Sequence, residues 1–143
     1  MIFREAIKAD KEFILDANKK INILSGLNDS TFAERIDKDL FKDKACKSIV
    51  AEIDGHIAGF VLYSYIYWAN CGKGIYLSQA FVKDDYRGQG IYKQLLSELE
   101  KKEMDCNFIT DLVGPGNTIM KTVLSKLEFK SSDLITYYRM INR

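Results

Sequence analysis

Residues 76–96 read Tyr-Leu-Ser-Gln-Ala-Phe-Val-Lys-Asp-Asp-Tyr-Arg-Gly-Gln-Gly-Ile-Tyr-Lys-Gln-Leu-Leu. The first seven are rich in aromatic and β-branched side chains and predict a strand over 76–82. Ile91, Leu95 and Leu99 recur at helical spacing and predict a helix that begins beside the glycines. Free N–H groups at the start of a helix attract an anion, and glycine lets a phosphate approach without a Cβ in the way. The stretch therefore predicts a phosphate-binding turn at the end of a strand.

Two glycines alone are also consistent with an ordinary strand-to-helix turn, so other phosphate motifs must be compared. A P-loop requires Gly-Lys-Ser/Thr, which the chain lacks. The dinucleotide fingerprint requires a third glycine, whereas Tyr92 and Lys93 follow the glycine pair here. Neither alternative fits this turn.

The order of strand, arginine, glycines and helix resembles motif A of the GCN5-related N-acetyltransferase (GNAT) superfamily, R/Q-x-x-G-x-G/A. Arg87, Gly88 and Gly90 match this pattern, and Tyr92 stands where the family has a small residue. The resemblance implies that acetyl-CoA is the co-substrate and that its pyrophosphate lies on the backbone amides of residues 87–92. It also implies that the pantetheine arm pairs with the preceding strand.

A second resemblance, to motif B of the same family, covers residues 117–129. Asn117 and Lys126 match the motif, whereas Leu124 replaces its tyrosine and Glu128 its glycine. A left-handed backbone at Glu128 would cost on the order of 1 kcal/mol. The cofactor-binding residues implied by the two motifs are Phe81, Val82, Arg87, Gly88, Gln89, Gly90, Ile91, Tyr92, Asn117 and Lys126.

The rest of the chain predicts alternating helices and strands. A first strand covers residues 2–6, and a helix capped by Asp10 runs to Gly26. A second amphipathic helix follows Asp29 and Ser30. The turn Asp54-Gly55 joins strands over 48–52 and 57–68. Further strands are expected over 106–113 and 134–141, with a helix capped by Asn117 between them.

These elements predict one mixed α/β domain over residues 1–143. The resemblance implies the GNAT fold, a central, mixed but mostly antiparallel twisted sheet of six to seven strands flanked by about four helices. The final strand is expected to form a sheet edge or a dimer contact, so both monomer and homodimer stay open.

Composition excludes several classes of function. The 143 residues are 47% hydrophobic and 29% charged, with a formal net charge of +1, which argues against broad nucleic-acid or membrane binding. Cys46, Cys71 and Cys106 have no metal-binding spacing, and His56 is the single histidine, so no metal is expected. The N-terminus lacks a signal-peptide core, which predicts a cytoplasmic protein.

Acetyl transfer to an amine needs a neutral nucleophile, a donor to the developing oxyanion, and a proton for the thiolate. The resemblance assigns the oxyanion to a backbone amide near Val82. It places Ser78 and Tyr76 where two branches of the family carry a glutamate base, and Leu124 where the family's tyrosine protonates the thiolate. One of the tyrosines Tyr63, Tyr65 and Tyr76 could then act instead.

The sequence thus predicts an N-acetyltransferase that acetylates a primary amine of a small molecule or peptide by direct attack in a ternary complex. The alternative is an acyl-CoA-binding module without turnover, serving as a sensor or structural partner.

Overall fold

The computed structural model describes residues 1–20, 32–139 and 141. The predicted helix end at Gly26 and the predicted cap at Asp29 and Ser30 lie outside these residues. Contacts divide the chain into two compact units, residues 1–112 and 113–143, and each is described by itself. A single domain over 1–143 stays a prediction.

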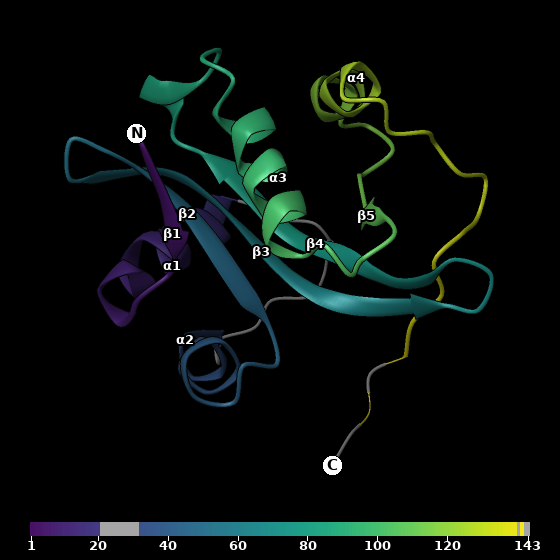
Figure 1. Ribbon diagram of the computed structural model, residues 1–143, viewed down its shortest axis with the longest axis horizontal. Helices are drawn as coiled ribbons and strands as arrows, with labels where there is room; N and C mark the ends of the chain where they lie inside the picture. The colour runs from purple at the N-terminus through teal and green to yellow at the C-terminus, as the bar shows by residue number, and fades with distance from the viewer. Residues whose placement is uncertain (21–31, 140, 142–143) are drawn as a thin grey trace. The chain divides into compact units, whose positions relative to one another are not determined.

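One five-stranded sheet forms the first unit, in the order β1-β2-β3-β4-β5 (Figure 1). Its strands are β1 (Ile2–Glu5), β2 (Lys47–Ile53), β3 (His56–Trp68), β4 (Gly72–Val82) and β5 (Ile109–Asp111). The first four run antiparallel, and β5 pairs parallel to β4. This confirms the mixed, mostly antiparallel sheet, with five strands in place of six or seven.

One predicted strand is not formed by the described residues, which leaves five strands in place of six, and another is shorter than predicted. Residues 134–139 are not a strand, since they pair with no described strand and their apolar side chains stay exposed, Leu134 by 83% and Tyr137 by 90%. The strand predicted over 106–113 shrinks to β5. Asn107 is held outside it, because its N–H donates to Lys73 C=O at 2.8 Å and its side chain to Cys71 C=O at 2.9 Å.

The helical segments are η1 (Lys8–Asp10), α1 (Lys11–Lys20), α2 (Phe32–Ile36), the π-helical η2 (Asp37–Lys42), η3 (Asp84–Tyr86), α3 (Ile91–Lys102) and α4 (Thr118–Lys126). Asp10 does not cap α1 as predicted. It closes η1 instead, where its carboxylate accepts from Ile7 N–H at 2.7 Å and pairs with Arg4 at 2.7 Å. The charge of Arg4 from β1 therefore fixes the start of this helical region.

The two faces of the sheet are covered by different helices. On one face, α1, α2 and η2 bury a cluster formed by Ile14, Ala17, Ile36, Leu40, Val50, Phe60 and Leu62. On the other, α3 crosses the sheet and contacts β2, β3 and β4, with Ile91, Leu95 and Leu99 fully buried (Figure 1). We call these the α1 face and the α3 face.

Two departures from regular strand structure shape β3 and β4. The predicted hairpin turn is confirmed, since Asp54 (φ 51°) and Gly55 (φ 78°) both have the positive φ of a tight β-hairpin turn. Between β3 and β4 the register shifts, so Leu62 opposes Gln79 while Tyr63 opposes Leu77. Ser78 is the extra residue of this β-bulge, and its hydroxyl donates to Leu62 C=O at 3.0 Å.

The outer edge of β4 extends past its neighbour. β5 pairs with β4 only along Ile75–Leu77, whereas β3 pairs with β4 as far as Val82. Among the described residues no strand covers the outer edge of β4 over residues 78–82. The two parallel strands therefore diverge after Leu77 and Asp111, at a point that we call the fork.

Candidate functional site

The turn after β4 has the backbone conformation that its glycines permit. Gly88 and Gly90 both have φ of 76°, and Gly90 is the N-cap residue of α3. A side chain at either position would be strained, because L-residues rarely adopt this conformation. An ideal Cβ at Gly88 would meet no atom within 4 Å, so the space above this part of the turn is open.

The start of α3 leaves backbone donors for which no acceptor is found in the described part of the chain. The first hydrogen bond of the helix runs from Gln94 N–H to Gly90 C=O at 3.1 Å, and no side chain caps Gly90. The N–H groups of residues 91–93 therefore have no acceptor within the helix. Together with the helix dipole, they form a site of positive potential suited to an anion.

Arg87 anchors this turn to the strand that precedes it. Its Nε donates to Val82 C=O at 3.0 Å, and its guanidinium pairs with Asp84 at 3.0 Å. The same group lies 5.9 Å from the ring centroid of Phe81. Gln89 contributes a weaker contact, from its Nε2 to Asp85 C=O at 3.4 Å. We call residues 87–92, held in this way, the cradle.

On the α1 face, β4 presents polar groups beside the bulge. Tyr76 opposes Ser64 and Gln79 opposes Leu62, so both lie on one face of the sheet although they are three residues apart. Gln79 donates to the side-chain oxygen of Asn18 in α1, and its own Oε1 is buried without a hydrogen-bond partner among the described residues. Burial, and then the charge of Asp111, raise the pKa of Tyr76.

Two buried polar groups were not recognised from the sequence as titratable: Asp111, at the end of β5, and Tyr92, in the first turn of α3. Burial raises the pKa of Asp111 to about 6. The Tyr92 hydroxyl is buried without a hydrogen-bond partner in the described part of the chain, and burial followed by Asp111 raises its pKa well above the usual value. The available signal was a single carboxylate, Asp111, in the strand predicted over 106–113.

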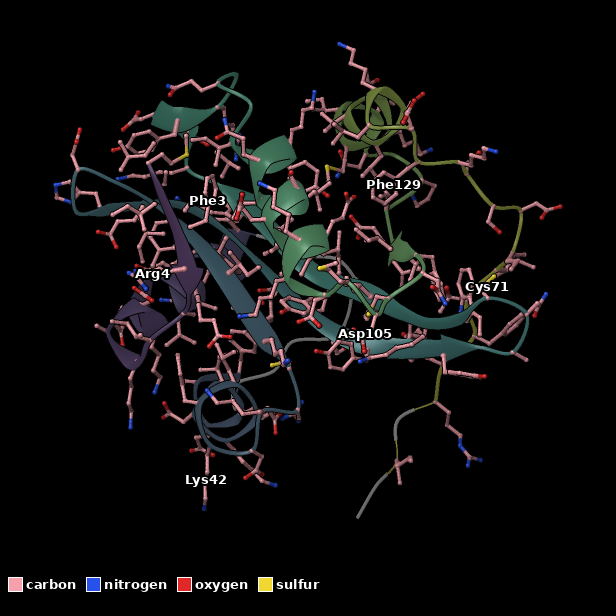
Figure 2. All side chains as sticks on the ribbon, in the orientation of Figure 1. Phe3, Arg4, Lys42, Cys71, Asp105 and Phe129 are labelled. Atoms are coloured by element: carbon pink, nitrogen blue, oxygen red, sulfur yellow. The ribbon has the colours of Figure 1, made fainter. Side chains whose placement is uncertain are left out.

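The tyrosines of β3 are engaged elsewhere. Tyr63 is fully buried, and its hydroxyl donates to Glu103 at 2.7 Å. Tyr65 donates to the other oxygen of Glu103 at 2.7 Å, while Tyr67 is 73% exposed. Neither Tyr63 nor Tyr65 is therefore free to replace a catalytic tyrosine. The labelled Asp105, near Glu103 in sequence, pairs with Lys73 at 2.7 Å (Figure 2).

Asn117 and Lys126 belong to the second unit, whereas β4 and the cradle belong to the first. Asn117 caps α4 as predicted, since its side-chain oxygen accepts from Met120 N–H at 3.1 Å. Lys126 is the last residue of α4. Glu128, just beyond, has φ of 65°, which confirms a left-handed residue at the family's glycine position.

Comparison with known proteins identifies the class. The model of the acetyltransferase (GNAT) family matches residues 13–129, and the chain belongs to this family. An acetyltransferase of Pectobacterium atrosepticum is 36% identical over 102 residues, which cover 70% of this chain and 64% of the relative. The match thus spans less than two thirds of that relative's length.

Solved structures share the fold. The chain is similar to AAC(6')-Iy, solved with the bisubstrate analogue CoA-S-monomethyl-acetylneamine, with a TM-score of 0.78 and 22% identity over 99% of this chain and 98% of that one. It is also similar to a possible acetyltransferase from Clostridium difficile 630, with a TM-score of 0.81 and 17% identity over 99% and 98% of the two chains. Among the described residues, no helix combines the length and apolar character needed to cross a membrane.

Proposed function

We propose that the protein is an N-acetyltransferase that transfers the acetyl group of acetyl-CoA to a primary amine of a small molecule or peptide. The observation that carries this proposal is the continuity of two binding elements. The uncovered outer edge of β4 over 78–82 leads, through the turn at Arg87, into the unpartnered amides at the start of α3. A long molecule with a diphosphate at one end and amide groups along its arm fits both.

The strand geometry sets where the ends of such a ligand would lie. The diphosphate of acetyl-CoA would accept hydrogen bonds from the cradle, and the amides of its pantetheine arm would pair with the uncovered edge of β4. Four residue steps along a strand cover about 13 Å, so an arm that starts beside Val82 ends beside Ser78. The thioester would then lie at the fork, next to Leu77 and Asp111.

The acceptor would approach from the α1 face. The unpartnered Gln79 Oε1 can accept a hydrogen bond from an amine, and Asn18 holds the Gln79 side chain in place. Tyr76 lies on the same face. The neutral amine would attack the thioester carbonyl directly, and positioning alone can remove several kcal/mol of the barrier.

The remaining catalytic assignments concern the oxyanion and the base. A backbone N–H near Val82 would donate to the oxyanion, which needs no particular side chain. The Ser78 hydroxyl is already donated to Leu62 C=O, so its oxygen can act only as an acceptor. The similarity to AAC(6')-Iy, solved with a CoA-containing analogue, supports a CoA donor.

The test has two readings on the purified protein. Calorimetric titration with acetyl-CoA measures donor binding, and a thiol reagent measures free CoA released with neamine, lysine, spermidine and a peptide with N-terminal alanine. Binding together with amine-dependent CoA release supports the proposal. Binding without release on any amine favours the acyl-CoA-binding module, and no binding refutes both.

A further inference from the structure

The last turn of α1 lies beside the second half of β4. The Gln79 side chain donates to Asn18 near the end of this helix. Two residues further along both elements, the Lys20 ammonium lies 5.8 Å from the ring centroid of Phe81. Gln79 and Phe81 point to the same face of the sheet, because side chains two residues apart along a strand do so. Lys20 therefore lies on the α1 face, next to the part of β4 that carries the Gln79 Oε1.

The positive charge of Lys20 is not offset by a neighbouring carboxylate. Among the described residues no carboxylate pairs with Lys20, whereas the adjacent Lys19 pairs with Asp16 at 3.6 Å. The Arg87 guanidinium lies 5.9 Å from the same Phe81 ring, so cations from two separate elements converge there. The potential beside Phe81 is therefore positive and suits an anionic group of a ligand.

We propose that the acceptor carries a carboxylate several bonds away from its reacting amine, as the side-chain amine of a basic amino acid does, and that Lys20 binds this carboxylate. The inference rests on the proposed function, in which the acceptor amine binds Gln79 Oε1 from the α1 face. Lys20 is then a residue that determines acceptor specificity, since it contacts the acceptor at a distance from the reacting atoms.

The spacing along β4 selects the position of the carboxylate on the acceptor. Gln79 and Phe81 are two residues apart, which is about 7 Å along a strand. An extended lysine places its side-chain nitrogen about 7 Å from its carboxyl carbon, across a chain of single bonds of about 1.5 Å each. In an α-amine the same two atoms are only about 2.5 Å apart. An α-amine bound at Gln79 would therefore hold its carboxylate nearer to Gln79 than to Lys20.

The same charges disfavour a polycationic acceptor. A second ammonium in place of the carboxylate would lie beside Lys20 and be repelled by it. The nearest acidic side chain of α1 in sequence, Asp16, is 69% exposed and already paired with Lys19, so it offers no compensating charge. Spermidine and neamine should therefore be poorer acceptors than lysine.

The test compares 6-aminohexanoate with 6-aminohexanamide, which carry one amine each and differ only in the charge at the other end. Release of CoA is measured for the wild type, for Lys20→Gln and for the matched control Lys19→Gln, whose lysine is 78% exposed. We expect the wild-type kcat/KM to favour the carboxylate by about fivefold, the upper range for an exposed ion pair, mainly through a lower KM. Lys20→Gln should abolish this preference, and Lys19→Gln should keep it.

Each other result contradicts the proposal. A wild type that acetylates both compounds equally, or neither of them while it acetylates another amine, overturns the inference and leaves the acetyltransferase function standing. Equal losses of the preference in the two variants remove the specific role of Lys20. Weaker acetyl-CoA binding in Lys20→Gln with the preference retained assigns Lys20 to the donor instead. A wild type that releases no CoA with any amine removes the proposed function and this inference together.

Discussion

Replacing Gly88 by glutamate and by glutamine tests whether the diphosphate binds at the cradle. Both side chains require the same backbone, at φ 76°, and each should cost roughly 1 kcal/mol of stability. Neither meets steric resistance at the Cβ, which has no neighbour within 4 Å. The two variants differ only in charge, so their difference isolates the electrostatic contribution to acetyl-CoA binding.

The size of that difference follows from Coulomb's law. Two like charges about 6 Å apart repel by about 3 kcal/mol at an effective dielectric of 20 and by about 0.7 kcal/mol in bulk water. Gly88 is exposed, so we expect an intermediate value near 1.4 kcal/mol, which weakens binding about tenfold. Added salt should reduce the difference, because the Debye length shortens from about 10 Å at 0.1 M to about 3 Å at 1 M.

Calorimetric titration of both variants with acetyl-CoA at low and high salt gives the answer. Unfolding curves of the two proteins provide the control, since they should coincide within a few tenths of a kcal/mol. Equal affinities of Gly88→Glu and Gly88→Gln for acetyl-CoA at low salt would refute the reasoning, because they would show that the diphosphate does not bind at the cradle.

Three further predictions concern stability. Glu128→Gly should raise the free energy of unfolding by about 1 kcal/mol, because glycine tolerates the left-handed backbone there; urea unfolding that shows no gain would contradict this. The pKa of Asp111 is about 6 in the folded protein against 3.8 ordinarily, so the stability from its proton is full below pH 3.8 and is lost as the pH rises through 6. Asp111→Asn should therefore be more stable than the wild type by up to about 3 kcal/mol at pH 7.5, and this advantage should shrink at pH 4.5. Urea unfolding that gives the same difference in stability at both pH values would argue against a buried Asp111 carboxyl with a raised pKa. Tyr63→Phe should cost about 2 kcal/mol, since it removes a donor from the buried Glu103, whereas Tyr67→Phe should cost nothing measurable by thermal unfolding; equal losses in the two variants would contradict the assigned hydrogen bond.

Local signals predicted the central part of the fold well. The strand, glycine turn and helix over residues 76–96 follow from residue types that act on their own neighbours. The Asp54-Gly55 hairpin is of the same kind, because a positive φ at two successive residues is a local requirement. The cap at Asn117 likewise needs only an oxygen three residues before a free N–H.

Features that depend on distant partners escaped prediction. Asp10 looked like a helix cap, but Arg4 from β1 binds its carboxylate and shifts the helical start to η1. Residues 134–139 have strand-forming side chains, and a strand needs a partner that they lack among the described residues. The Gln79 Oε1 and the Tyr92 hydroxyl have no hydrogen-bond partner among the described residues because the fold buries them. The identity of their neighbours in sequence does not reveal this burial.

The extra residue at Ser78 determines which side chains of β4 face α1 and which face α3. Upstream of it, odd-numbered side chains such as Leu77 point into the layer beneath α3; downstream, odd-numbered Gln79 and Phe81 point toward α1 instead. Deleting this one residue would invert the second half of the strand, drive Gln79 into an apolar layer and withdraw Phe81 from its aromatic neighbours Phe13 and Phe60. A single insertion thus lets one strand pack its odd-numbered side chains beneath α3 at its beginning and present them toward α1 at its end.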